Sequence, residues 1–335
     1  MSSFIPEMAQ DERLTGVIDT ISDGYRTLNR KPWLVAIPVL LDLYLWLGPR
    51  LTASPLFQRL SIFPASPVGL PPEQARALQQ LQEAVAKSAS GFNLFTLLSP
   101  GLLGVPSMVG PGTLSASFAN GMPWIFSVSS NLVFLWLFGL LVFAGLLLGC
   151  FYLGLIAQAV RDGGLDVGRL LRRVWLYWAR LLFFLALAMT TLFVLGMPLL
   201  LLLGLASLVS PHLASLLLGI AWVATLWVAF YLYFFVDALV VSEVGVFRAI
   251  WSSVMVIHHH FPSSFGFIIL SILIGLGLPL AWQLLLGSPW GVPIAIVGNA
   301  YVGTGLIAAS MIFYRDRYVR IQATAARLKN LSMGK

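Results

Sequence analysis

Asp42 is the residue whose type and position point most directly to chemistry, because it lies near the middle of the apolar segment 33–47. A carboxylate at membrane depth is costly, so it normally faces the interior of a helix bundle, a polar partner or water. Two roles are open for it: a proton or cation site, or a neutral acid hydrogen-bonded to a neighbouring helix. Asn299, in a later apolar segment, is the second polar residue of this candidate site. Other hydroxyl and amide side chains could supply partners: Thr190, Thr191, Gln283, Thr304 and Ser310.

Three consecutive histidines, His258 to His260, could suggest a metal site. Consecutive residues on a helix point about 100° apart, so three in a row cannot chelate one ion without distortion. The sequence favours a hinge or headgroup-level role for them, with a pH-sensitive contact as the alternative. Asp237 falls near the end of another apolar segment, where we expect it to reach water as a solvated end charge.

The sequence carries no catalytic signature that we can identify. HExxH, GxxxxGK[ST], GxSxG and a strand-GxGxxG-helix unit are all missing from it. Asp162 and Asp166 have a DxxxD spacing, which by itself indicates solvated acids more than metal–phosphate chemistry. We therefore expect a protein that is not an enzyme and that uses no cofactor and no metal.

The composition explains why an isolated carboxylate stands out. Hydrophobic residues make up 59% of the chain and charged residues only 10%, against about a quarter charged in soluble domains. The net charge of +7 comes from short clusters beside apolar runs, which indicates anionic lipid headgroups as partners and not nucleic acid. Such a sequence predicts an all-α integral membrane protein.

Six apolar segments are candidates for membrane spans, since a span needs about 20 apolar residues to cross about 30 Å of hydrocarbon. Segment 33–47 is short and contains Pro38 as well as Asp42. The other five segments are clearly long enough to cross the hydrocarbon core: 132–156, 181–208, 213–236, 265–286 and 292–313. We therefore predict a six-helix transmembrane bundle.

The distribution of basic residues sets the orientation, because Lys and Arg are retained on the cytoplasmic side. With six spans, sixteen of the 20 Lys and Arg residues lie in cytoplasmic segments, and the other side holds only Arg50, Arg59, Arg76 and Lys87. The first 32 residues contain no uninterrupted apolar stretch before a cleavage site. We expect no cleaved signal peptide, cytoplasmic N- and C-termini, and the plasma (inner) membrane of a prokaryote as the location.

The cytoplasmic segments have a repeated character. Apolar residues recur at helical spacing in segments 1–31, 165–180 and 243–260, opposite charged residues, and Ser242 is a plausible N-cap for the third. The chain therefore reads as three units, each made of an interfacial helix and two spans, followed by a basic tail over 314–335. These helices either lie in the headgroup plane or act as elbows that fold against the bundle.

A long external loop, 50–130, follows the first span. Segment 71–88 predicts a helix, with prolines at its start. Segment 92–109 is apolar but broken by Pro100, Gly101, Gly104 and Pro106, which indicates an interfacial or re-entrant lid and not a seventh span. The lid either covers a lipid-accessible cavity or packs on the outer rim of the bundle.

Small residues and cysteine complete the sequence picture. Gly145 and Gly149 form a GxxxG step, and Gly298, Gly303 and Gly305 recur in the last span, which predicts close helix packing within the chain or in a homo-oligomer. Cys150 is the only cysteine, so an intramolecular disulfide is excluded.

Segment 241–254 resembles the repeated unit of a bacterial membrane-protein group related to the membrane domain of glycerophosphoryl diester phosphodiesterases. Glu243, Gly245, Ala249 and Ser252 or Ser253 carry the likeness, which extends through span order over 130–320. In that group the hydrolase is a separate soluble domain. The resemblance therefore implies an accessory membrane domain with no activity of its own assigned.

Three functions remain open at this point. An accessory, scaffold or lipid-handling membrane component, with a membrane-protein partner or a second copy, fits the interfacial helices and the lack of catalytic motifs. A transporter or channel would use Asp42 as an intramembrane proton or cation site. An intramembrane enzyme would require Asp42 and another acid or histidine to converge in one wet cavity.

Overall fold

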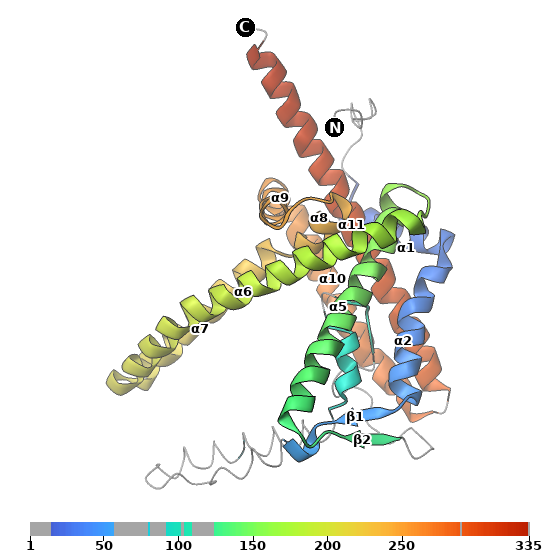
Figure 1. Ribbon diagram of the computed structural model, residues 1–335. Coiled ribbons are helices and arrows are strands. Elements are labelled where there is room, and N and C mark those ends of the chain that lie inside the picture. Colours follow the sequence, from blue (N-terminus) through green and yellow to red (C-terminus); the bar gives the residue numbers. More distant parts are fainter. Residues whose placement is uncertain are drawn as a thin grey trace. The chain divides into compact units, whose positions relative to one another are not determined.

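The computed structural model describes residues 15–56, 80, 92–101, 104–108, 124–288 and 290–333, and it is almost entirely helical there (Figure 1). Five stretches of helix are long and apolar enough to cross a membrane: α5 (Asn131–Arg161), α6 (Val167–Val209), Pro211–Val241, α10 (Phe261–Gln283) and α11 (Gly291–Met333). The prediction of an all-α membrane protein is confirmed at this level.

The first apolar segment forms a shorter helical element. A 3-10 turn, η1 (Pro32–Val35), leads into α2 (Ala36–Leu47). Together they span Pro32–Leu47, or about 24 Å at 1.5 Å per residue. That length is below the roughly 30 Å of a hydrocarbon core, so whether this segment crosses depends on the membrane around it.

The interfacial helix predicted at 165–180 and the span predicted at 181–208 are one continuous helix, α6. Asp166 starts it, because its carboxylate accepts a hydrogen bond of 2.9 Å from the backbone N–H of Arg169. No Gly or Pro lies between Gly168 and Gly196 to end it. The change from polar to apolar side chains near residue 180 leaves backbone hydrogen bonding unaffected, so the two predicted segments are successive parts of one helix.

The span predicted at 213–236 is interrupted instead. α7 (Pro211–Tyr231) ends before a turn, and α8 (Phe235–Val241) continues after it. The hydroxyl of Ser253 donates a hydrogen bond of 2.7 Å to the backbone carbonyl of Tyr231, one of the carbonyls at this break. The break is therefore stabilised by a tertiary contact.

α9 (Val246–His259) corresponds to the third predicted interfacial helix, but it begins at a different residue. Gly245 is the N-cap, and Ser242 instead ends α8. The predicted N-cap at Ser242 is therefore wrong, because Glu243 adopts a φ of 55° that turns the chain between the two helices. The basic tail predicted at 314–335 continues α11 as helix up to Met333.

The chain forms two compact units. Unit 1 comprises Met1–Arg30, Gly154–Leu273 and Gly305–Lys335, and unit 2 comprises Lys31–Leu153 and Ile274–Thr304. In unit 1, α1 (Val17–Arg30) lies within the predicted amphipathic segment 1–31, of which residues 1–14 lie outside the described residues, and it packs on α11 through glycine. A Cβ on Gly24 would lie 2.6 Å from the Cβ of Ala309, so only glycine permits this close approach.

Unit 2 holds the described parts of the external loop. β1 (Arg50–Thr52) pairs in parallel with β2 (Ile125–Ser127), a contact that the sequence did not indicate. The loop continues through η2 (Leu94–Leu98), which packs against α5 where Gly145 meets the carbonyl of Leu97. The helix predicted at 71–88 lies outside the described residues except for position 80.

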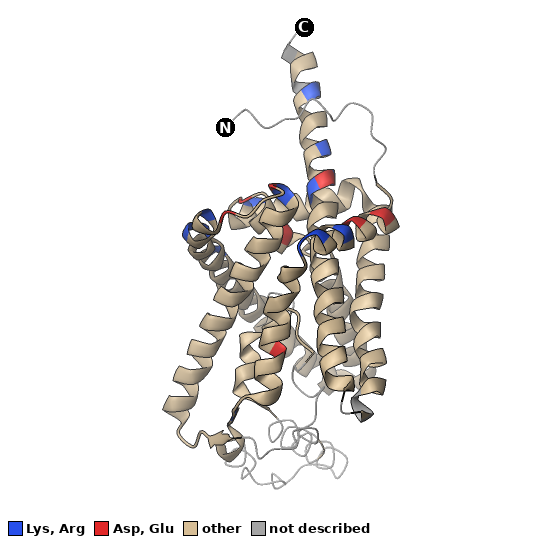
Figure 2. Ribbon diagram, turned by 90° about the vertical axis from the view of Figure 1, so that its right-hand side faces the viewer, with Lys and Arg blue, Asp and Glu red and all other residues tan. Residues whose placement is uncertain are grey.

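Charged residues of unit 1 gather on α1, the first turns of α6, α9 and the last turns of α11 (Figure 2). The apolar stretches of these helices carry very few. This separation is typical of helices whose apolar parts lie in hydrocarbon and whose charged parts lie in water or headgroups.

Candidate functional site

Asp42 is fully buried in unit 2, on the middle turns of α2. The hydroxyl of Ser107 donates a hydrogen bond to its Oδ1, and the backbone N–H of Met108 donates one of 2.9 Å to its Oδ2. Both donors come from segment 104–108 of the external loop. Asp42 therefore fixes part of the predicted lid onto α2.

Apolar packing surrounds this polar contact. Met108 belongs to a buried cluster with Val292, Ala295 and Ile296 of α11, against which Val39, Leu43, Trp46 and Trp282 pack. Pro106 lies against Gly303, where a Cβ would come within 2.6 Å of the proline ring. The described part of the lid is thus packed against protein, which favours the packed reading over an open cavity at this position.

The partners predicted for Asp42 are not the ones that the structure gives it, and two of them are engaged elsewhere. Asn299 is half-buried on α11, and the hydrogen bonds of the described residues do not join it to Asp42. Thr304 pairs with the hydroxyl of Tyr152 at 2.7 Å, and Ser310 donates to Asp237. The sequence identified a polar residue that matters but not its partners, because Ser107 and Met108 lie about 65 residues away along the chain.

Asp237 in unit 1 was predicted to be a solvated end charge, and this is wrong. It is 6% exposed, and its Oδ2 accepts a hydrogen bond from the Ser310 hydroxyl of α11. Six of the seven residues of α8 are buried, so this short helix is covered on nearly all sides. Beside it, the rings of Phe234, Phe267 and Phe313 stack in a buried group.

The densest polar constellation is one that the sequence did not reveal, and it centres on Glu243 in unit 1. Arg161 donates from Nη1 to Oε1 at 2.7 Å, and the Tyr177 hydroxyl donates to the same oxygen at 2.9 Å. Arg173 pairs with Oε2, and Arg180 donates to the backbone carbonyl of Glu243 at 2.8 Å. A single half-buried carboxylate therefore joins α5, α6 and the turn before α9.

The left-handed backbone of Glu243 explains how one residue reaches so many partners. A φ of 55° is costly for a residue with a Cβ, by about 1 kcal/mol, and such conformations persist only where surrounding contacts enforce them. The ion pairs to Arg161 and Arg173 supply that enforcement. The other residues of the family resemblance are also structural: Gly245 caps α9, and Ala249, Ser252 and Ser253 are buried.

Arg161 also pairs with the neighbouring Asp162, through two hydrogen bonds of 2.8 and 2.9 Å. The hydrogen bonds from Arg161 hold the pKa of the Asp162 carboxyl below its usual range. Asp162 therefore stays ionised and serves as a structural ion-pair partner. Asp166 caps α6, so both acids of the DxxxD pair already have structural partners within the chain.

The histidines do not converge on one point. His258 and His259 are exposed, with ring centroids 5.8 Å apart, and His259 Nδ1 hydrogen-bonds to the carbonyl of Met255. Across the described ranges, no three His, Cys, Asp or Glu side chains form a group that could hold a metal ion.

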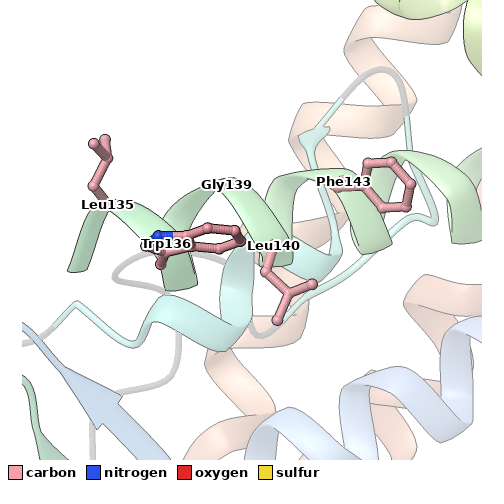
Figure 3. Close-up of a pocket in the computed structure, with 5 residues that line it drawn as sticks. All are labelled: Leu135, Trp136, Gly139, Leu140 and Phe143. Carbon is pink, nitrogen blue, oxygen red and sulfur yellow. The ribbon is translucent and has the colours of Figure 1, made fainter. Parts of the chain in front are cut away.

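One shallow hollow on α5 is entirely apolar in its lining apart from the indole nitrogen of Trp136 (Figure 3). Leu135, Trp136, Gly139, Leu140 and Phe143 enclose about 400 Å³ on the exposed face of the helix. It contains no titratable or nucleophilic group, so it can accommodate an apolar chain and perform no reaction.

Comparisons with protein-family models, with curated proteins and with solved structures find no match for this chain.

Proposed function

We propose that this protein is a non-enzymatic accessory or lipid-handling component of a prokaryotic plasma membrane, held to anionic headgroups by two repeated arginine–tryptophan faces. One observation carries the proposal. α6 exposes Arg172 and Trp175, and α9 exposes Arg248 and Trp251, each pair three residues apart on one face.

These faces have the composition of helices that lie against headgroups. Trp175 is 53% exposed and Trp251 67% exposed, each on a helix whose opposite side is buried. Leu171 and Leu176 add exposed apolar surface on α6, and Phe247 does so on α9. Indole rings prefer the headgroup boundary, and each arginine near an anionic surface contributes about 1 kcal/mol of attraction.

The arginines of the two faces differ from those of the Glu243 cluster. Arg161 and Arg173 are paired with Glu243, whereas Arg172 and Arg248 make no ion pair within the described ranges. The exposed Arg172 and Arg248 are therefore available to bind an external anion, whereas Arg161 and Arg173 already share a carboxylate.

The two-arginine variant Arg172→Gln with Arg248→Gln tests this function. In nanodiscs made from an equal mixture of phosphatidylglycerol and phosphatidylcholine, we expect the wild type to enrich phosphatidylglycerol among its retained lipids. Each lost arginine should lower that enrichment about fivefold, because 1 kcal/mol corresponds to that factor. Native mass spectrometry of the protein–lipid complexes measures the ratio.

Arg26→Gln is the matched control, because Arg26 is exposed but already paired with Asp23 at 3.2 Å. It should leave the enrichment unchanged. Raising the salt concentration should weaken the wild-type preference, since exposed charges are screened. Equal enrichment in the double variant and the wild type would refute the proposed function.

The proposed topology has six spans, arranged as three units of an interfacial helix and two spans, with both termini in the cytoplasm. The charge distribution supports it, and the continuous α6 modifies one unit by joining its interfacial helix to its first span. In a Cys150→Ala background, we expect Ser210→Cys to react with a membrane-impermeant maleimide on intact cells. Ser332→Cys should react only after permeabilisation, and the opposite pattern would contradict the orientation.

Transport is the second candidate, and the break between α7 and α8 favours it. Interrupted spans beside a buried carboxylate are typical of ion and substrate sites in transporters, and Asp237 lies three residues beyond the break. Asp42 fits a transport site less well, because two donors of the lid already satisfy its carboxylate. A water-filled path reaching Asp237 would be required for transport.

A further inference from the structure

Arg317 is the most unusual charge in unit 1, because it is buried and pairs with no acid among the described residues. Its side chain lies on α11 and the residue is 1% exposed. It makes no ion pair with any acid of the described ranges, and its neighbour Asp316 is paired with Arg315 at 3.0 Å. Placing a cation inside a protein without compensation costs several kcal/mol.

The hydrogen bonds that Arg317 does make are weak. Nη1 donates to the carbonyl of Phe313 at 3.5 Å and Nη2 to the carbonyl of Thr15 at 3.3 Å, both at or beyond the usual limit for an N–H···O bond. Nε has no acceptor in the described part of the chain. The guanidinium carbon lies 3.3 Å from the centre of the Phe313 ring, a cation–π contact that contributes about 2 kcal/mol or more when desolvated but supplies no negative charge.

Arg317 has little opposing charge around it. Asp316, at the next position, supplies some, but its carboxylate is paired with Arg315. Burial and then the charge of Arg317 lower the pKa of His260, so this histidine stays neutral at pH 7 and adds no further positive charge. Arg315 and Arg320 lie on the same helix within three residues. The site therefore has a fixed cation and an Nε donor without an acceptor, and no acid of the described residues forms an ion pair with the cation.

We propose that Arg317 is a binding site for a phosphate group, which provides the missing counter-ion. A guanidinium offers parallel N–H donors in a planar fork, and phosphate oxygens match that fork in two positions at once. The contact that must yield is the long one to Thr15, just before α1. Because this part of α11 lies at headgroup depth in the proposed topology, the inference rests on that topology, and phosphate arrives there either as a lipid headgroup or as a free ion.

Replacing Arg317 should change the thermal stability of the protein in opposite directions in detergent and in the presence of anionic lipid. In dodecyl maltoside and a phosphate-free buffer, Arg317→Met should raise the thermal midpoint of unfolding above that of the wild type, since it removes an uncompensated cation. When phosphatidylglycerol is added, the wild type should be stabilised by about 3 °C or more and Arg317→Met hardly at all. Arg317→Lys keeps the charge but loses the fork, so its lipid affinity should fall about tenfold or more.

Three further arms separate the explanations. If inorganic phosphate added without lipid stabilises the wild type, the site is supported and its ligand is a free phosphate ion. If only phosphatidylglycerol stabilises the wild type, the site is supported and its ligand is the lipid headgroup. Arg320→Gln, an exposed change one turn away, should behave as the wild type. A midpoint for Arg317→Met that is not above the wild type in detergent would overturn the proposal.

The acids that precede Thr15 in the sequence provide another decisive variant, Asp11→Asn with Glu12→Gln. A fall in the detergent midpoint that depends on Arg317 would show that the chain supplies its own counter-ion, and it would overturn the phosphate site. Arg172→Gln with Arg248→Gln leaves Arg317 intact, so failure of the proposed function and failure of this site are distinguishable.

Discussion

Replacing Asp42 with alanine is expected to destabilise the protein by about 3 kcal/mol, one of the two largest effects of a single side chain in this structure. The carboxylate accepts from the Ser107 hydroxyl and from the backbone N–H of Met108, and it is fully buried. Removing it takes this acceptor from the half-buried Ser107 hydroxyl and from the buried N–H of Met108. The unfolding midpoint in a lipid nanodisc measures the loss, and limited proteolysis near 104–108 should accelerate at the same time.

Ser107→Ala is the matched control, because it removes one donor and leaves the carboxylate with the N–H of Met108. It should cost about 1 kcal/mol and leave the loop protected. Asp42→Asn, which keeps an acceptor oxygen, should fall between the two. Full stability of Asp42→Ala with an intact loop would mean that this contact does not hold the lid, and a proton or cation site would then become the better reading of Asp42.

Glu243→Ala is expected to cost about 2 kcal/mol, because Arg161 and Arg173 lose their shared carboxylate and Tyr177 loses its acceptor. The effect is smaller than for a fully buried pair, since the side chains of Arg161, Arg173 and Glu243 are 24%, 43% and 20% exposed. Chemical unfolding in detergent measures it. It should shrink at high salt, as the remaining repulsion between arginines is screened.

Comparing Glu243→Gly with Glu243→Ala separates the contribution of the lost carboxylate from the cost of the left-handed backbone. Both variants lose the carboxylate, but glycine adopts a φ of 55° without strain, whereas alanine does not. The glycine variant should therefore be more stable than the alanine variant by about 1 kcal/mol. Equal stability would show that the turn relaxes once the ion pairs are lost.

The sequence predicted the apolar helices well because hydrocarbon imposes a strong local requirement. Segments 132–156 and 292–313 lie within α5 and α11, although α11 continues well beyond residue 313. Segment 265–286 begins within α10 and ends in the 3-10 turn η5 (Leu284–Gly287). Of the glycines predicted to pack closely, Gly305 lies against the Tyr25 ring of α1, whereas Gly145 and Gly303 lie against the external loop at Leu97 and Pro106.

Errors arose where a tertiary contact decides the local structure. The break after Tyr231 has no Gly or Pro to mark it, and it depends on the hydroxyl of Ser253, 22 residues later. The pairing of Arg50–Thr52 with Ile125–Ser127 joins segments more than 70 residues apart, which no local pattern shows. Each of these features requires knowledge of which segments meet.

The candidate site was predicted in part for the same reason. The cost of a mid-segment carboxylate singled out Asp42, but its donors in the loop could not be foreseen from spacing. The position of Asp237 near the end of an apolar segment predicts access to water. The side chain has no such access, because α8 is packed on nearly all sides. The sequence does not show the cluster around Glu243, because its arginines lie on two separate helices, α5 and α6, and meet the carboxylate only through a left-handed turn.

The most direct test of the account is a structure of the full chain in native nanodiscs, extracted without detergent and with bound lipids resolved. We expect phospholipid headgroups against the Arg172–Trp175 and Arg248–Trp251 faces, and no water at Asp42 or Asp237. Bare faces together with a continuous water-filled path to either carboxylate would contradict the lipid-handling function and establish transport in its place.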